Sequence, residues 1–172
     1  MRTSLSERLL SLATLDDDDA RRLLASARRL RRATRGGEPV RLLKGRHVAT
    51  EGERRPDARA DLFEVAATSL GARVSWIPSS LLLDETAQAA ATTTRLLPRL
   101  YDALECKSVA RERAVTLHRL AGVPVYLDLG GVRHPIRGLL AAMAGEPEDA
   151  QNWSADEDLM MLMQAVLVET LT

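Results

Sequence analysis

The 172-residue sequence has little of three things on which common functional sites depend. It contains one cysteine, Cys106, so no disulfide can form within the chain. Aromatic residues make up 3% of the sequence, which leaves few side chains on which nucleic-acid bases could stack. Lysine plus arginine number 24, as do aspartate plus glutamate, so no excess positive field exists to hold a polyanion. These shortages argue against a nucleic-acid partner.

Long apolar runs are missing as well. No segment is long and apolar enough to cross a membrane, and no signal peptide is recognisable, so we expect a cytoplasmic protein with no membrane partner. The hydrophobic content of 45% suits one domain with a sizeable core, because domains commonly contain about 100–200 residues. We therefore expect residues 1–172 to form a single domain, with no room for a second.

Charge is concentrated at the two ends of one segment with helical spacing. Four aspartates, Asp16 to Asp19, begin it, and five arginines lie between Arg28 and Arg35. A helix dipole favours anions early and cations late. We therefore interpret the two runs as helix capping; a basic binding patch is the alternative.

The rest of the chain alternates between helical and strand-like patterns. Ser154 and Glu157 have the spacing of a capping box at the start of the last helix. Alternation of this kind predicts an α/β fold of three layers, with a four-stranded parallel sheet and helices on both faces. Ligands of such folds bind beyond the carboxyl ends of the strands, here after Thr50, Pro78, Lys107 and Leu129. The predicted helices span 16–35, 58–70, 85–97, 109–120, 134–144 and 155–171, and the predicted strands 47–50, 73–78, 102–107 and 123–129.

Several segments resemble the aspartate and ornithine carbamoyltransferases, in the order and spacing of that family. Phe63–Ala67 and Leu70–Val74 resemble the helix and strand that follow its phosphate loop, and His134–Arg137 resembles its His-Pro-x-Gln motif. The likeness implies the fold of the family's carbamoyl-phosphate-binding domain and, as in the family's trimers, self-association through that domain. The other matching segments are Leu43–Gly45, Thr93–Asp102 and Leu120–Val125.

The end of the chain resembles the family's final helix, which follows the second domain and packs back on the first. Here residues 155–171 follow the His-Pro segment after a short loop. The resemblance thus implies that the amino-acid-binding domain has been excised. This last helix is apolar on nearly all sides, so we expect it to be covered by its own domain and by another subunit.

The family's phosphate loop, Ser-Thr-Arg-Thr-Arg, is degenerate in this sequence. The corresponding residues, Pro56 to Ala60, have lost both arginines and retain one cation, at Arg59. Pro56 has no N–H to donate, and Asp57 adds a negative charge. Since charged hydrogen bonds contribute roughly 1.5–3 kcal/mol each, we expect phosphate binding to be weakened by several orders of magnitude.

Of three other ligand positions of the family, two carry a different residue in this sequence and one is kept. Lys107 replaces an arginine, and an ammonium cannot form a bidentate fork. His134 is kept, whereas Arg137 replaces the glutamine and offers donors but no acceptor. The degenerate ligand-binding set is therefore Arg59, Lys107, His134 and Arg137, and no catalytic residue is assigned. For each of these residues the alternative is an ordinary structural or solvated role.

The remaining candidate residues favour structural roles. We expect Cys106 to be buried in a strand, and His47 and His118 to bind no metal, because neither has a ligand-spaced partner. Arg54, Arg55 and Arg59 are interpreted as solvated loop residues, with a new anion site formed by the three as the alternative. No cofactor is expected.

Three functions remain open at this point. The first is a non-catalytic binding, assembly or regulatory module that forms a homo-oligomer or joins a full-length carbamoyltransferase paralogue. The second is an enzyme or sensor for a small anionic metabolite, with a pocket built from Arg59, Lys107, His134 and Arg137. The third is residual carbamoyl transfer in a complex that supplies the missing domain.

Overall fold

The strand segments lie side by side in one parallel sheet. The computed structural model describes residues 4–10, 15–37, 40–53, 61–83, 95–144 and 153–172. All three strand pairs are parallel, in the order β2-β1-β3-β4, which confirms the predicted four-stranded parallel sheet. The strands are β1 (His47–Glu51), β2 (Arg73–Ile77), β3 (Ala103–Cys106) and β4 (Val125–Leu127).

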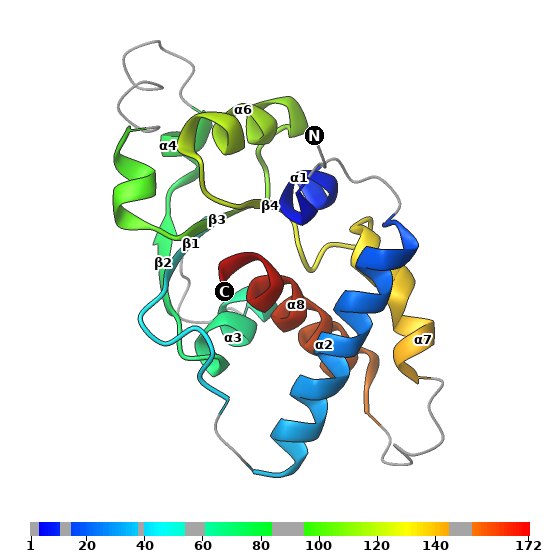
Figure 1. The fold of residues 1–172 in the computed structure, drawn as a ribbon. Helices are drawn as coiled ribbons and strands as arrows, with labels where there is room; N and C mark the ends of the chain where they lie inside the picture. Colours follow the sequence, from blue (N-terminus) through cyan, green and yellow to red (C-terminus); the bar gives the residue numbers. More distant parts are fainter. Residues whose placement is uncertain (1–3, 11–14, 38–39, 54–60, 84–94, 145–152) are drawn as a thin grey trace.

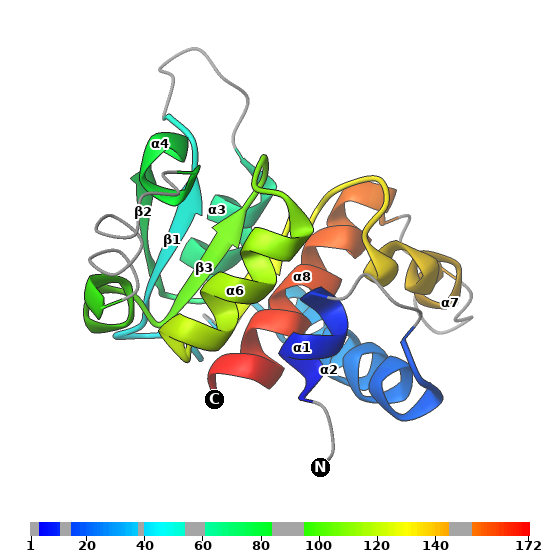
Figure 2. The same ribbon diagram turned by 90° about the horizontal axis from the view of Figure 1, so that it is seen from above.

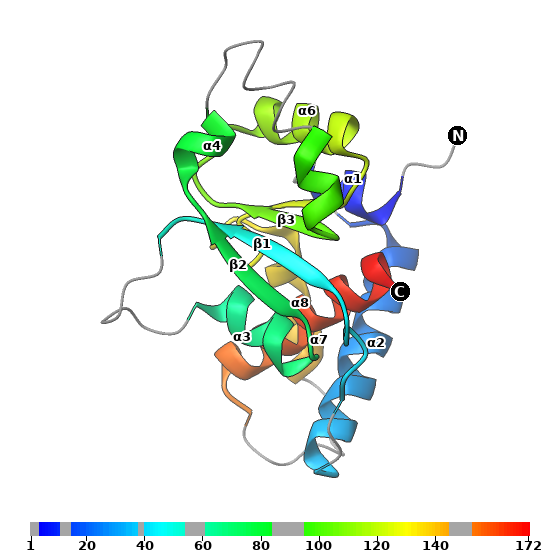
Figure 3. The same ribbon diagram turned by 90° about the vertical axis from the view of Figure 1, so that its left-hand side faces the viewer.

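Helices cover both faces of this sheet (Figure 1). Helices α1, α4 and α6 lie on one face, and α3 and α8 on the other, with α2 packed on the outer side of α8. Figure 3 shows α3 and α4 on opposite sides of β1 and β2. The helices are α1 (Leu5–Leu10), α2 (Asp17–Arg35), α3 (Leu62–Ser69), α4 (Ser79–Leu83), α6 (Arg111–Ala121), the 3-10 helix η1 (Pro135–Leu139), α7 (Leu140–Ala144) and α8 (Ala155–Leu171).

Two apolar cores form because successive strand residues point to opposite faces. On β1, Val48 belongs to the core under α3 and α8, whereas Ala49 belongs to the core under α4 and α6. Strand β3 repeats the pattern with Ala103 and Leu104. The parity of a residue on a strand therefore decides which face its side chain reaches.

Helix α8 lies within the chain's own core. Ten of its seventeen residues are buried, against α2, α3, α7 and η1 (Figure 2). Its start is fixed by the predicted capping box of Ser154 and Glu157, which is confirmed. The buried Asp158 accepts a hydrogen bond of 2.9 Å from Arg31 of α2. Elements of the same chain cover the buried side of α8, and the expectation that a second subunit covers the rest stays a prediction.

Several element boundaries differ from the sequence-based predictions. The strand predicted at 73–78 ends at Ile77 and is followed closely by α4, and the helix predicted at 134–144 starts as the tighter 3-10 helix η1. Helix α1 was not predicted, because its six residues are too few to show a period. Of the helix predicted at 85–97, only residues 95–97 lie in the described part, and helical structure continues there to residue 100.

Candidate functional site

A cavity of about 340 Å³ lies at the carboxyl ends of β3 and β4. Strand order reverses between β1 and β3, because β2 lies on one side of β1 and β3 on the other. Such a switch point is where open α/β sheets bind ligands. The cavity is lined by Asp61, Leu62, Phe63, Glu105, Lys107, Asp128, Gly130 and Met163.

Of the predicted site residues that the structure describes, Lys107 lines this cavity, and its ammonium already has partners. Its Nζ forms an ion pair with the carboxylate of Asp61 and lies 3.8 Å from Glu105 Oε2. The same nitrogen lies 4.8 Å from the centroid of the Trp76 ring, a cation–π contact. A ligand would have to displace Asp61 to reach the full charge of Lys107.

Asp61 lies at the start of α3, where the free backbone N–H groups of a helix can bind an anionic ligand. It is the N-cap, and its Oδ1 accepts a hydrogen bond of 3.1 Å from the N–H of Glu64. The resident carboxylate therefore uses one of the free backbone donors and places a negative charge at the helix start. The degenerate loop itself, including Arg59, lies outside the described residues, as do Arg54 and Arg55.

Glu105 contributes a buried acid to the cavity. Its side chain points to the α3 and α8 face, and its Oε2 accepts a hydrogen bond of 2.7 Å from the hydroxyl of Thr50. Burial raises the pKa of Glu105 to about 7, against the opposing effects of Lys107 and Thr50. A carboxyl group of this kind changes charge near neutral pH.

His134 is the N-cap of η1 and is buried. It is not among the described residues that line the cavity. Its Nδ1 accepts a hydrogen bond of 3.4 Å from the N–H of Ile136, and its Nε2 has no partner among the described residues. Burial lowers the pKa of His134 to about 4, so the ring is neutral at physiological pH. The local cap role, which the sequence offered as an alternative, describes the observed contact.

Arg137 is directed at the backbone of the loop after β4. Its Nη2 donates to the carbonyl of Gly130 at 2.9 Å, and its Nε donates to that of Gly131 at 3.0 Å. These bonds hold the loop that forms one wall of the cavity. Arg137 thus touches the cavity wall through Gly130. Of the predicted set Arg59, Lys107, His134 and Arg137, the structure describes the last three, and only Lys107 of these lines the cavity itself.

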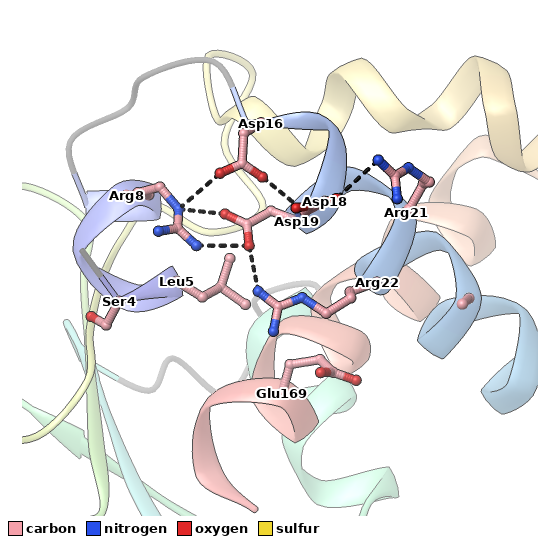
Figure 4. A pocket seen from close by; sticks show the side chains of 10 residues that line it. Ser4, Leu5, Arg8, Asp16, Asp18, Asp19, Arg21, Arg22 and Glu169 are labelled. Atoms are coloured by element: carbon pink, nitrogen blue, oxygen red, sulfur yellow. Dashed lines mark hydrogen bonds and ion pairs between the residues drawn. The ribbon is translucent and has the colours of Figure 1, made fainter. Parts of the chain in front are cut away.

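A larger hollow, of about 720 Å³, lies away from the sheet, between α1, the start of α2 and the end of α8 (Figure 4). Its acidic and basic groups pair with one another: Arg8 Nη2 and Arg22 Nη2 each lie 2.8 Å from Asp19 Oδ1. Burial alone would raise the pKa of Asp19, but these two arginines outweigh it and hold the pKa below its usual value.

The acidic run at the start of α2 thus serves to cap and anchor helices. Asp16 is the N-cap, and its Oδ1 accepts a hydrogen bond of 2.8 Å from the N–H of Asp19. On the exposed side of the same turn, Arg21 pairs with Asp18 at 2.9 Å. The capping interpretation of the aspartates is confirmed.

The remaining candidate residues have structural surroundings. Cys106 is buried in β3, and burial raises the pKa of its thiol to about 12. His47 Nε2 lies 2.8 Å from the hydroxyl of Ser75, and His118 Nδ1 lies 3.0 Å from the carbonyl of Val123. In the described residues, no cluster of three metal-ligating side chains occurs, and no helix has the length and apolarity to span a membrane.

Sequence reasoning missed three members of the site: Asp61, Glu105 and Trp76. Glu105 carried a usable signal, because it is an acid within the otherwise apolar strand Ala103–Cys106. Asp61 precedes the helical Phe63 at N-cap spacing, a signal of the same kind. The sequence of β2 did not indicate the role of Trp76, because its ring contacts Lys107, which follows a different strand, β3.

Comparison with known families gives a consistent result. Residues 7–145 match the family model for the aspartate/ornithine carbamoyltransferase carbamoyl-P binding domain. The chain is also similar to the catabolic ornithine carbamoyltransferase of Pseudomonas putida, with 36% identity over 128 residues. That alignment covers 74% of this chain and 38% of the relative. The chain therefore spans well under half the length of that protein.

Solved structures show the same partial coverage. The ornithine carbamoyltransferase of Pyrococcus furiosus matches with a TM-score of 0.58 and 26% identity, over 73% of this chain and 40% of that one. The catalytic subunit of aspartate transcarbamoylase from M. jannaschii matches with a TM-score of 0.57 and 20% identity, over 74% of this chain and 42% of that one. The similarity to the aspartate transcarbamoylase subunit shows a shared fold only.

Proposed function

Because the chain belongs to the aspartate/ornithine carbamoyltransferase family through its carbamoyl-phosphate-binding domain, we propose that it is a domain without transferase activity of its own. In this proposal it acts as a binding, assembly or regulatory module. The observation that carries the proposal is the Asp61–Lys107 ion pair at the start of α3. There, a carboxylate of the chain itself takes the place of a bound anion.

The charges around the cavity support the same proposal. Carbamoyl phosphate is a dianion and needs guanidinium forks, helix N–H groups and donors to its carbonyl. Among the described residues, the lining of the cavity instead combines three acidic side chains, Asp61, Glu105 and Asp128, with one ammonium, that of Lys107. Repulsion from these acids opposes entry of a dianion. Transfer would also need the second substrate held in place, and this chain matches only part of the enzymes it resembles.

We predict that excess carbamoyl phosphate raises the melting temperature of the chain by less than about 1 °C, because a ligand stabilises a protein only as far as it binds the native state. Differential scanning fluorimetry measures this. The matched variant is Asp61→Ser, which keeps a capping hydroxyl but frees Lys107, and it should respond more than the wild-type chain. A large shift for the wild type would contradict the proposal. A response to another anionic metabolite would favour the sensor built on Arg59, Lys107, His134 and Arg137.

Exposed apolar side chains support an assembly role. Leu96 and Leu100 stand four residues apart in the helical segment 95–100 and are 48% and 55% exposed, whereas Leu97 between them is buried. Residues at this spacing share one helix face. The segment directly precedes β3, so this pair lies toward the amino edge of the sheet, away from the cavity.

We predict that the chain associates, with itself or with a full-length carbamoyltransferase, and that Leu96→Glu with Leu100→Glu abolishes the association by placing charge in an apolar contact. Light scattering after chromatography measures the mass. The matched control is Val132→Glu, since Val132 is 85% exposed at the carboxyl edge of the sheet. A chain that is monomeric alone and in these mixtures argues against assembly. Formation of citrulline or carbamoyl-aspartate in a mixture would instead support residual transfer.

A further inference from the structure

Glu51 lies in a second polar site, on the opposite face of the sheet from the cavity. It is the last residue of β1 and is 1% exposed. Its parity on the strand is that of Ala49, which belongs to the core under α4 and α6. Thr50 and Glu105 share the other parity and meet on the α3 and α8 side. The sheet therefore separates the Glu51 carboxylate from the cavity.

The Glu51 carboxylate is surrounded by hydrogen-bond donors. Its Oε2 accepts from the backbone N–H groups of Lys107, at 2.6 Å, and Ser108, at 2.9 Å. Its Oε1 accepts from the Ser108 hydroxyl, and the hydroxyl of Ser79 donates to the carboxylate as well. Burial alone would raise the pKa of Glu51, but these hydrogen bonds outweigh it and keep the pKa below its usual value. The group is an ionised carboxylate with four donors.

The donors come from the chain elements around Glu51 and not from its own strand. Two are backbone N–H groups directly after β3, and β3 is fixed between β1 and β4 by parallel pairing. The N–H of Asp128 donates to the carbonyl of Cys106 at 2.7 Å and holds the last residue of β3 in place. A rigid set of donors is a preorganised anion site, because it needs no reorganisation to accept an oxyanion.

We propose that Lys107 N–H, Ser108 N–H and the hydroxyls of Ser108 and Ser79 form an oxyanion cradle for a small carboxylate, and that Glu51 is its tethered occupant. In the wild-type chain, the covalent tether gives Glu51 an effective concentration that a free anion does not match. Truncation to alanine removes a group of the size and charge of acetate and leaves buried donors without an acceptor. Free acetate then fills the cradle.

The test is chemical rescue of a Glu51→Ala variant, followed as melting temperature. Excess sodium acetate, compared with sodium chloride at equal ionic strength, is expected to raise the melting temperature of Glu51→Ala by about 3 °C or more. Acetamide, the neutral counterpart of acetate, is expected to give less than half of that rise. The wild-type chain and Glu51→Gln, in which a side chain of the same size fills the cradle, are expected to show no response specific to acetate.

Glu105→Ala is the matched control, because it truncates another buried glutamate of the same sheet. Within the described residues, Glu105 accepts its hydrogen bond from a side chain, the Thr50 hydroxyl, and not from backbone N–H groups. An equal acetate response in Glu51→Ala and Glu105→Ala overturns the proposal, and so does the absence of any response in Glu51→Ala. If Glu51→Ala does not fold in chloride, the yield of folded protein after refolding from urea is compared in acetate and in chloride. Recovery in acetate alone supports the cradle, and equal failure in both overturns it.

Discussion

Relative to the wild-type chain, a Glu105→Gln variant is expected to gain up to about 3 kcal/mol in free energy of unfolding when the pH is raised from about 4 to about 8. Burial raises the pKa of Glu105 from 4.5 to about 7 in the folded state. Between these two values, the folded chain keeps a proton that the unfolded chain has released. The contribution of Glu105 to the free energy of unfolding therefore falls as pH rises through this window, and it levels off above the folded pKa.

Glutamine removes that dependence, because it cannot ionise, while it keeps an acceptor for the Thr50 hydroxyl, which lies 2.7 Å from Glu105 Oε2. Urea unfolding at a series of pH values measures the difference. The matched control is Glu112→Gln, which makes the same change at an exposed position of α6. A Glu105→Gln profile parallel to the wild-type profile would contradict a raised pKa of Glu105 in the folded chain.

A His134→Asn variant is expected to change the pH profile in the opposite direction. Burial lowers the pKa of His134 from 6.5 to about 4 in the folded state. Below about pH 6.5 the unfolded chain takes up a proton at this residue while the folded chain does not, so the contribution of His134 to the free energy of unfolding falls as pH decreases toward 4, by up to about 3 kcal/mol. Asparagine does not titrate and retains an acceptor at the N-cap of η1.

Urea unfolding at the same series of pH values measures this effect. The free energy of unfolding of the wild type, minus that of His134→Asn, is expected to decrease as pH falls from about 7 to about 4. His118→Asn is the control, since its half-buried ring contacts the carbonyl of Val123 at the surface side of α6. It is expected to give a smaller change. A constant difference between wild type and His134→Asn across this range would contradict a buried, neutral imidazole.

The two buried groups oppose each other in the wild-type chain. Between about pH 4.5 and 6.5, the contribution of Glu105 falls with rising pH while that of His134 rises by a similar amount per pH unit. Their effects on the free energy of unfolding nearly cancel in this window. Each single variant therefore exposes a slope that the wild-type chain conceals, and the double variant is expected to be nearly flat again.

The prediction about the phosphate loop came from the sequence and its resemblance to the carbamoyltransferases. Compared with the Ser-Thr-Arg-Thr-Arg loop of that family, Pro56 to Ala60 lacks both arginines, and this predicts weaker anion binding. The resemblance likewise implies that Lys107 stands in place of an arginine. What the sequence did not indicate is that Lys107 is already paired with Asp61, because 46 residues separate the two.

Local patterns also decided most of the fold. The strand segments, the capping box at Ser154 and the aspartate cap of α2 depend on neighbours within a few residues, so their spacing in the sequence was sufficient. Tertiary structure decided everything that depends on strand order and face. The pairing of β1 with β3 places Glu51 against the donors of Ser108 and places Glu105 against Thr50 on the other side. These contacts join residues more than fifty positions apart, and their energies come from burial, which a linear pattern does not specify.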